Sequence, residues 1–545
     1  MTREPAEPLR LDYLIKAGTV HSMAGQTYRA IGVRGAEIAA VSAGPAGLDD
    51  LAGPETLVAD TPEAALLPAF ADSHEHLMEA SRNTLLVPVA AARSVAEFTG
   101  MISEAARGAA PGAWILTSMS WHESNLAENR MPTGAELDAA APGHPVLARR
   151  GGHLAVASAA ALEAAGIGPD TPDPAGGRIG RLPGGQPSGL LEGGAVYQVA
   201  AFAPKPATAE LAAALGTGSA AYAALGVGTI REAMVTLDDL PAYAEAWRRG
   251  LLSVRARPMI RVGNELTAAQ ALDMVRGLGA WSGLGDDWLR IWGLKFVLDG
   301  GVEGGALEQP YAHEPTQSGH LNWDPGVMIE VCTEAVRRGW RIGTHAAGDR
   351  AVRTLLDVYE GVVAATGPLP PWTLVIEHAL LSDRAQRERA VRNGFGITVQ
   401  HTLLWNMGSE MLVAWGPERT RQVNPLDDWL TLGASLAAGT DLARPVSPLL
   451  NVWGMVTRGT RAGRDPGGRA CHRSGRRHQA VHRGHRRTER RLRQTRHDRP
   501  GKLADVVAYP ADPLAVSPGD LPGLTPVFTM VGGRPVYDPG GLFAR

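Results

Sequence analysis

The sequence predicts an α/β protein: a TIM-like (β/α)8 barrel with a large insertion after its first strand, plus a small β-sandwich built from both chain ends. Eight apolar runs that end in polar residues alternate with stretches rich in Ala, Glu and Arg, as a barrel of this kind requires. Short alternating or β-branched runs, typical of strands, occur at both ends of the chain. The chain has 545 residues, 44% hydrophobic and 20% charged, which is enough for a large core and more than one domain.

The sandwich is predicted from strand-like runs that Gly and other turn residues separate. We expect residues 1–66 and 500–545 to form this discontinuous domain. The runs lie at 12–20, 28–35, 37–44, 502–510 and 525–538.

The barrel is expected over residues 67–465. Its strands are predicted at 65–74, 226–232, 253–263, 289–299, 340–345, 372–378, 394–401 and 433–441. The long interval after the first strand predicts an insertion over about 85–220, which the Gly and Pro content suggests is a compact subdomain with loops.

Composition restricts the environment and the partners of the protein. Only two cysteines occur, Cys332 and Cys471, so a disulfide framework is excluded and a reducing compartment is favoured. The N-terminus lacks the pattern of a signal peptide, and no run of about 18 apolar residues occurs. With a net charge of −3, we expect a cytoplasmic protein that binds neither a membrane nor nucleic acid, and whose partner is a small molecule.

A segment at 466–499 differs from the rest of the chain. Residues 469–499 contain 12 Arg and 5 His against one Glu and one Asp, with almost no apolar periodicity. A basic arm for nucleic acid and a solvated, disordered run are two interpretations. We favour a third, translation in a shifted reading frame of GC-rich DNA, which the nucleotide sequence would test.

Histidines and one aspartate end several of the predicted strands. His74 and His76 are two residues apart, so in a strand they project from the same face. His345, His378 and Asp441 also follow apolar runs. Because the carboxyl ends of barrel strands meet at one face, these five side chains predict a site for zinc or a similar ion.

Lys295 is unusual because the chain has only four lysines among 53 basic residues. It lies inside the predicted strand at 289–299. A buried amine loses its proton more readily than a guanidinium, and a neutral amine can add CO2 to form a carbamate that bridges two metals. The alternative is a lysine that reaches the strand end or pairs with Asp299.

Six stretches of the chain together resemble the amidohydrolase superfamily, and most closely its YtcJ-like branch, to which N-substituted formamide deformylases belong. They are LLPAFADSHEHL, GLKFVLDGGVEGGALEQPY, THAAGDRAV, VIEHALL, GTDLARPVSPLLNVWGMVTRG and PGKLADVVAYPADPL. The resemblance implies a metal-binding barrel with a discontinuous β-sandwich. It also implies six metal-site positions: His74, His76, Lys295, His345, His378 and Asp441.

This resemblance implies a metal-dependent hydrolase of non-peptide carbon–nitrogen bonds, in amides or formamides, that uses water activated by the metal. Asp441 would take a proton from this water and pass it to the leaving amine. His378 or His153 would stabilise the developing oxyanion. Glu377 precedes His378, so we expect it on the opposite face of the strand, in a supporting role only.

The expected substrate contacts lie outside the metal-binding set. His153 and Trp121 are pocket candidates because the stretch from Ser120 to Ser158 also resembles this branch. Glu303, in a loop just after Lys295, is a third candidate. We expect one or two zinc ions, a carbamate on Lys295 as an option, a small-molecule amide as substrate, and allow for a homodimer.

Three alternatives to an amide hydrolase remain open. A deaminase on the same fold would need a catalytic Glu three residues after His345, where the chain has Gly348. An ester or phosphotriester hydrolase could use the same residues. The third alternative is a non-catalytic relative damaged by the change of reading frame.

Overall fold

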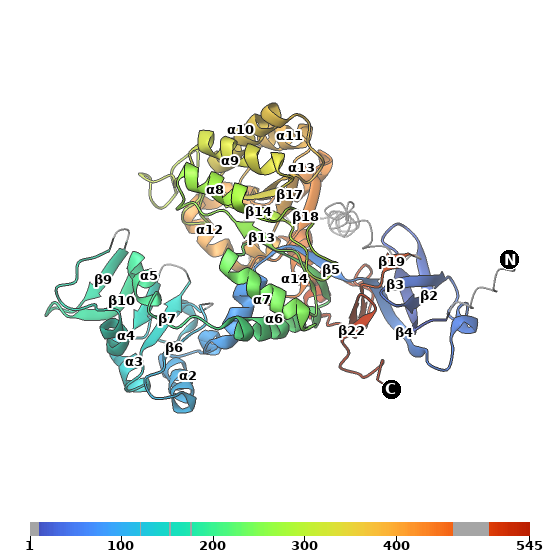
Figure 1. The fold of residues 1–545 in the computed structure, drawn as a ribbon, viewed down its shortest axis with the longest axis horizontal. Helices are drawn as coiled ribbons and strands as arrows, with labels where there is room; N and C mark the ends of the chain where they lie inside the picture. Colours follow the sequence, from blue (N-terminus) through green and yellow to red (C-terminus); the bar gives the residue numbers. More distant parts are fainter. Residues whose placement is uncertain (1–9, 120, 152–153, 175–176, 462–500, 545) are drawn as a thin grey trace. The chain divides into compact units, whose positions relative to one another are not determined.

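The chain forms two compact units in the computed structural model (Figure 1). One unit comprises residues 1–78 and 219–545, and the other comprises residues 79–218. The structure describes residues 10–119, 121–151, 154–174, 177–461 and 501–544. The unusual segment at 466–499 and the predicted pocket residue His153 therefore lie outside the described residues.

Strands from both ends of the chain form one eight-stranded sheet. Its order is β19-β3-β2-β1-β4-β20-β21-β22, so strands from the C-terminal end pair on either side of N-terminal ones. The bounds are β1 Tyr13–His21, β2 Thr27–Arg34, β3 Glu37–Ser42, β4 Leu57–Pro68, β19 Lys502–Leu503, β20 Val506–Tyr509, β21 Phe528–Val531 and β22 Arg534–Tyr537. An apolar core that includes Ile15, Ile31, Val506 and Phe528 stabilises it.

The body of the first unit contains two parallel sheets. One has the order β12-β11-β5 and the other runs from β13 to β18 in chain order. Most of these strands are buried on both faces, as parallel strands usually are, which explains their continuous apolar runs. The bounds are β5 Phe70–Glu75, β11 Val227–Glu232, β12 Arg255–Ala256, β13 Met259–Arg261, β14 Gly293–Val297, β15 Ile342–Ala346, β16 Leu374–His378, β17 Gly396–Val399 and β18 Ser435–Ala438.

Backbone hydrogen bonds connect the two parallel sheets at both edges. Beyond β11, Val235 N–H donates to Met259 O at 2.9 Å, and Arg261 N–H donates to Val235 O at 2.8 Å. Beyond β18, Asp441 N–H donates to His74 O at 3.0 Å. The carboxyl ends of β5 and β18 are therefore neighbours, and Thr440 contacts Glu75 although the two residues are 365 positions apart in the sequence.

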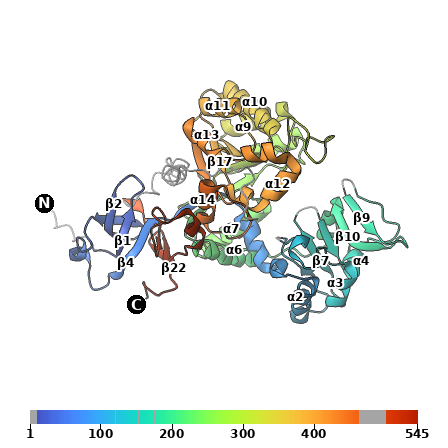
Figure 2. The ribbon, with the colours of Figure 1, turned by 180° about the vertical axis from the view of Figure 1, so that it is seen from behind.

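Helices cover the second parallel sheet (Figures 1 and 2). In both views α9, α10 and α11 lie together beside β17. In α10, Val352, Leu355, Leu356 and Tyr359 are buried at helical spacing and belong to the main core. The bounds are α6 Thr208–Ala223, α7 Leu240–Arg248, α8 Ala268–Gly277, α9 Pro325–Arg337, α10 Asp349–Thr366, α11 Arg384–Arg392, α12 His401–Gln422, α13 Leu426–Thr431 and α14 Pro448–Thr457.

The unit of residues 79–218 has its own sheet and cores. The sheet has the order β6-β7-β8-β10-β9, and Phe98 and Leu191 are fully buried in two separate clusters. The bounds are β6 Ile115–Leu116, β7 Val146–Arg150, β8 Leu154–Ala157, β9 Gly177–Arg181, β10 Pro187–Gly193, α2 Val95–Gly108, α3 Gly134–Ala140, α4 Ala159–Ala164 and α5 Gly194–Ala200.

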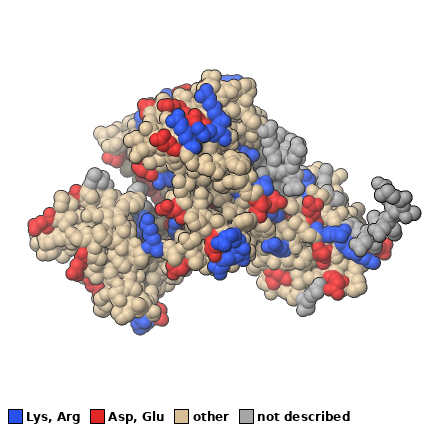
Figure 3. Space-filling view, viewed as in Figure 1, with Lys and Arg blue, Asp and Glu red and all other residues tan. Residues whose placement is uncertain are grey.

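Charged side chains of both signs are interspersed on the face shown in Figure 3, and most of that face is uncharged. None of the helices in the described ranges combines the length and the hydropathy that a membrane span requires.

Candidate metal centre

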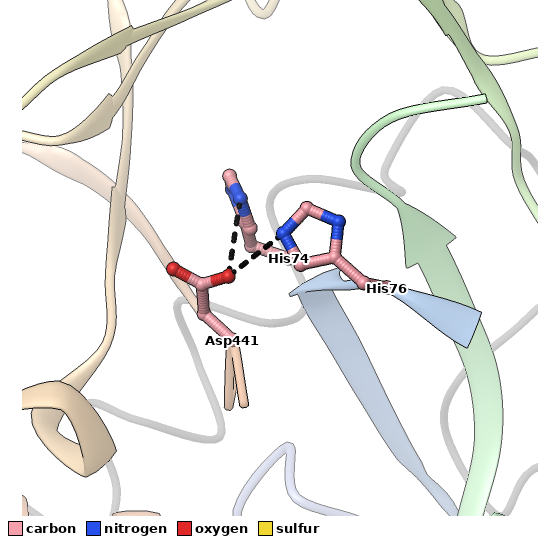
Figure 4. A group of neighbouring side chains, drawn as sticks. All are labelled: His74, His76 and Asp441. Atoms are coloured by element: carbon pink, nitrogen blue, oxygen red, sulfur yellow. Dashed lines mark ion pairs between the residues drawn. The ribbon is translucent and has the colours of Figure 1, made fainter. Parts of the chain in front are cut away.

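Three of the predicted ligands meet where β5 ends (Figure 4). The possible ligand atoms of His74, His76 and Asp441 all lie within 4.8 Å of one another. Asp441 Oδ1 is 3.0 Å from His76 Nε2 and 3.7 Å from His74 Nε2. His74 lies in β5, His76 directly follows this strand, and Asp441 follows β18. Two imidazoles and a carboxylate are a common donor set for Zn²⁺.

The other two predicted histidines complete the cluster. The ring of His378 lies 4.5 Å from the ring of His74 and 4.5 Å from that of His345, measured between centroids. Asp441 Oδ2 is 3.6 Å from His378 Nδ1. The structure therefore brings together His74, His76, His345, His378 and Asp441 from four strand ends.

Lys295 lies in β14, next to β15, and pairs in register with Gly343. It is 2% exposed, and its Nζ has no hydrogen-bond partner among the described residues. Burial, together with the positive charge of Lys295, lowers the pKa values of His74, His345 and His378. An unsatisfied buried amine is costly. Because Nζ lies beside this cluster, its unused bonding capacity is what a ligand group would satisfy.

Hydrogen bonds orient three of the imidazoles. His74 Nδ1 is 2.7 Å from Glu377 Oε2, His378 Nδ1 is 2.8 Å from Gln400 Oε1, and His345 Nε2 is 3.0 Å from Gly300 O. Each partner atom is an acceptor, so the named ring nitrogen carries the proton. The other nitrogen of each ring keeps its lone pair for a cation, and this arrangement is typical of metal-binding histidines.

Glu377 accepts three hydrogen bonds through one of its carboxylate oxygens. Its Oε2 accepts from His74 Nδ1, from Arg231 Nη2 at 2.7 Å and from Thr398 Oγ1 at 2.6 Å. Both Glu377 and His378 contact His74, so the predicted placement of Glu377 away from the His378 side is wrong. Strand alternation ends at His378, whose φ is +75°.

Buried carboxyl groups hold the segment after β18 against β5. Asp72 accepts from the backbone N–H of Thr440 at 3.1 Å and also contacts its hydroxyl. Glu75 contacts the same hydroxyl and accepts from Ala443 N–H at 2.7 Å. Asp441 itself has a φ of +52°, an uncommon conformation for a residue other than glycine. These contacts hold the segment in one conformation and so compensate for the strained backbone at Asp441.

The charge state of Asp441 suits a metal ligand. Burial disfavours its carboxylate, but the neighbouring His74, His76 and His378 hold the pKa of Asp441 well below its usual range. Burial likewise disfavours the His76 imidazolium, but its hydrogen bond to Asp441 outweighs burial and raises the pKa of His76 to about 9. A cation that binds here would replace the proton between His76 and Asp441.

For the amine of Lys295 and the imidazole of His345, burial outweighs the neighbouring charges that favour the protonated form. It lowers the pKa of Lys295 to about 8, although Glu377 and Asp441 favour the ammonium form. Burial and the charge of Lys295 lower the pKa of His345 to about 4. Neutral imidazoles and a readily deprotonated amine are the forms that bind cations or CO2. The donor set therefore fits a divalent ion.

The predicted substrate contacts have separate outcomes. Glu303 is exposed and lies near Tyr311, whose pKa burial raises to about 12. Trp121 is buried in the unit of residues 79–218, where its ring lies 4.7 Å from that of Phe98 and its Nε1–H donates to Arg149 O at 2.7 Å. These contacts are those of a core residue. His153 lies outside the described residues.

Sequence reasoning did not assign a role to Arg231, Asp72 or Thr440. Arg231 is 4% exposed and lies in β11, with its guanidinium carbon 4.4 Å from the ring centroid of Trp292. A charged residue inside an apolar strand was the available signal, since such a residue is seldom buried without a partner. The sequence offered no means to identify Glu377 as that partner.

The chain belongs to the amidohydrolase family, whose sequence profile matches residues 58–537. The predicted relationship to the YtcJ-like branch of the superfamily is also confirmed.

Two relatives and one solved structure illustrate the similarity. "Protein LONG AFTER FAR-RED 3" of Arabidopsis thaliana is 28% identical over 410 residues, covering 72% of this chain and 68% of the relative. N-substituted formamide deformylase of Arthrobacter pascens is 27% identical over 425 residues, covering 76% and 77%. The crystal structure of an uncharacterized metal-dependent hydrolase from Pyrococcus horikoshii OT3 has a TM-score of 0.73 at 22% identity, covering 93% of this chain and 99% of that one. At this identity the structural likeness shows the fold alone.

Proposed function

We propose that the protein is a metal-dependent hydrolase of non-peptide carbon–nitrogen bonds in amides or formamides. The observation that supports this most is the convergence of four histidines and Asp441. In three of these histidines one ring nitrogen donates a hydrogen bond to the protein, which leaves the other nitrogen for a cation. Membership of the amidohydrolase family and the similarity to an N-substituted formamide deformylase support the same reaction class.

One or two zinc ions are the proposed cofactor. The proposed ligands are His74, His76, His345, His378, Asp441 and, as a carbamate, Lys295. A bound divalent ion supplies Lewis acidity and lowers the pKa of water. The partnerless Nζ of Lys295 and its lowered pKa support carbamate formation.

Asp441 is the proposed proton carrier. Its carboxylate is held ionised and its backbone is anchored to β5, so it can accept a proton from water while the oxygen bonds to the carbonyl carbon. As the carbon–nitrogen bond breaks, the same proton passes to the leaving nitrogen.

Two roles were expected for His378, and the hydrogen bond to Gln400 bears on both. Gln400 Nε2 donates to Thr398 Oγ1 at 3.0 Å, which sets its Oε1 toward His378. Burial and the neighbouring His345 hold the pKa of His378 well below its usual range, so its ring is neutral. Because the single ring proton lies on Nδ1, Nε2 has none. This favours the ligand role over donation to an oxyanion.

The proposed fold places this chemistry at one face. The two parallel sheets are proposed to be one closed (β/α)8 barrel over 67–465, with residues 1–66 and 500–545 as a discontinuous sandwich and an insertion over about 85–220. Hydrogen bonds at both sheet edges support closure. The ligands would then lie at the carboxyl ends of the strands, where active sites of such barrels occur.

The position of Gly348 supports a hydrolase over a deaminase. Gly348 is the N-cap of α10 and its N–H donates to Asp299 Oδ2 at 2.9 Å. It has no side chain that could move a proton, whereas a deaminase of this fold needs a carboxylate there.

The test combines metal analysis with turnover. Purified protein is analysed for zinc and assayed with a panel of N-substituted formamides and N-acyl amines. His74→Ala should reduce bound zinc and abolish turnover, whereas His313→Ala, at an exposed histidine, should change neither. Folded protein that binds no zinc and hydrolyses no member of the panel would contradict the proposal.

A further inference from the structure

A cavity of about 470 Å³ lies away from the candidate metal centre. Its lining combines two tryptophans with charged and small residues: Trp247, Arg248, Gly250, Leu252, Asp286, Trp288 and Arg534. This volume falls within the range of small-molecule sites.

The cavity lies at the opposite ends of the parallel strands from the metal-binding residues. Gly250 and Leu252 come shortly before β12, and Trp288 comes shortly before β14. Arg534 begins β22 of the eight-stranded sheet. The metal-binding side chains instead lie at or near the carboxyl ends of strands, so the cavity has no part in the proposed reaction.

Two indole rings contribute flat apolar surface to the cavity. Trp247 is 42% exposed, and its Nε1–H donates to Asp286 Oδ2 at 2.8 Å, which holds the ring in place. Trp288 is partly buried, and the guanidinium carbons of Arg255 and Arg534 lie 5.3 and 5.0 Å from its ring centroid. Because Arg255 and Arg534 already stack on Trp288, the indole face left for a planar ligand is that of Trp247.

Both signs of charge line the cavity, but among the described residues the carboxylate of Asp286 is engaged in hydrogen bonds whereas the guanidinium of Arg534 is not. Asp286 accepts hydrogen bonds from Trp247 and from the backbone N–H groups of Trp288 and Leu289. Within the described ranges, the contact of the Arg534 guanidinium is with the Trp288 ring, 5.0 Å from its centroid. The guanidinium therefore retains five N–H donors for an anion.

The remaining arginines near the cavity are already engaged. Arg255 forms two hydrogen bonds to Asp505, at 2.8 Å each, and Arg248 pairs with Glu245. Arg534 is consequently the cation best able to bind an incoming group.

We propose that this cavity binds a planar aromatic anion, with the ring against Trp247 and the anionic group on Arg534. The shared chemistry is an aromatic ring that carries a sulfonate, carboxylate or phosphate, which a small aromatic acid and a nucleotide both provide.

The test is isothermal titration calorimetry of the full chain with benzenesulfonate. Methanesulfonate supplies the anion without the ring, and benzyl alcohol supplies the ring without the charge. Adenosine monophosphate is titrated in parallel, and the tighter of the two aromatic anions identifies the source. We expect saturable binding of at least one aromatic anion and binding at least about tenfold weaker for both partial ligands.

Variants locate the binding. Arg534→Gln should weaken binding about tenfold or more, and Trp247→Leu should weaken it several-fold. Arg392→Gln removes an exposed arginine of α11 and should leave binding unchanged. Because Arg534 is exposed, its loss should not impair folding, which thermal unfolding checks.

Two results would overturn the proposal: no saturable binding of either aromatic anion up to about 10 mM, or binding that Arg534→Gln does not change, which would place the ligand elsewhere. Because the measurement is of binding, its outcome is independent of hydrolase activity.

Discussion

Glu377→Gln isolates the charge of the carboxylate beneath His74. Glu377 Oε2 accepts three hydrogen bonds, whereas Oε1 has no hydrogen-bond partner among the described residues. Glutamine can therefore place its carbonyl oxygen at the Oε2 position and its amide nitrogen at the Oε1 position. The three hydrogen bonds persist and the negative charge is lost.

Two effects of different magnitude follow from this geometry. The side chains of Arg231 and Glu377 are 5% and 0% exposed, and their charged atoms are 2.7 Å apart. Loss of one charge from a buried pair costs about 3–5 kcal/mol of folding free energy. Because the carboxylate also makes the His74 ring a better ligand, we expect zinc affinity to fall about 10- to 100-fold.

The assay measures zinc affinity and stability separately. Zinc dissociation constants come from competition with a chelator of known affinity, and unfolding free energies come from urea titration. Asp505→Asn is the matched control because it breaks another buried arginine–carboxylate pair, Arg255–Asp505, whose atoms are 2.8 Å apart and whose side chains are 1% and 9% exposed. It should lower stability and leave zinc affinity unchanged. Equal zinc affinities in Glu377→Gln and the parent protein would refute the orienting role of Glu377.

Further predictions concern the metal, the buried amine and one close backbone approach. Asp441→Asn should lower kcat by about 10²- to 10⁴-fold with unchanged circular dichroism, and a chelator should abolish activity that zinc restores; undiminished turnover would remove Asp441 from its role. Burial lowers the pKa of Lys295 to about 8, against 10.5 for an exposed lysine. In metal-free, CO2-free buffer at a pH between these two values, the unfolded state therefore binds more protons than the folded state. Stability should therefore rise by about 3 kcal/mol as pH rises from 8 to 10.5, and urea titrations should show no such rise in Lys295→Met. A Cβ on Gly439 would lie 2.5 Å from the backbone nitrogen of His74, so Gly439→Ala should lower the unfolding free energy by about 1–3 kcal/mol and impair turnover. Gly100→Ala, in an exposed turn of α2 with open space around it, should instead stabilise by up to about 1 kcal/mol; destabilisation of both to the same extent would contradict the steric reasoning.

The sequence located the parallel strands and the residues that follow them. Strand β16 lies within the predicted run at 372–378, and β15 overlaps the run at 340–345. Such strands are buried on both faces and therefore read as apolar runs, so the polar residue that ends each run stands out. The sequence did not reveal the dihedral angle at His378, because nothing in the local pattern indicates where strand alternation will end.

The amino-acid sequence by itself determined which residues could bind a metal, because imidazole and carboxylate groups at strand ends are a property of residue type and period. It also marked Lys295, since lysine is rare in this chain. Only the tertiary structure decided how these groups are supported. Glu377 and His74 are 303 residues apart, and Asp72 and Thr440 are 368 apart. Contacts over such distances depend on which strands become neighbours, and that choice is made by the packing of the whole core.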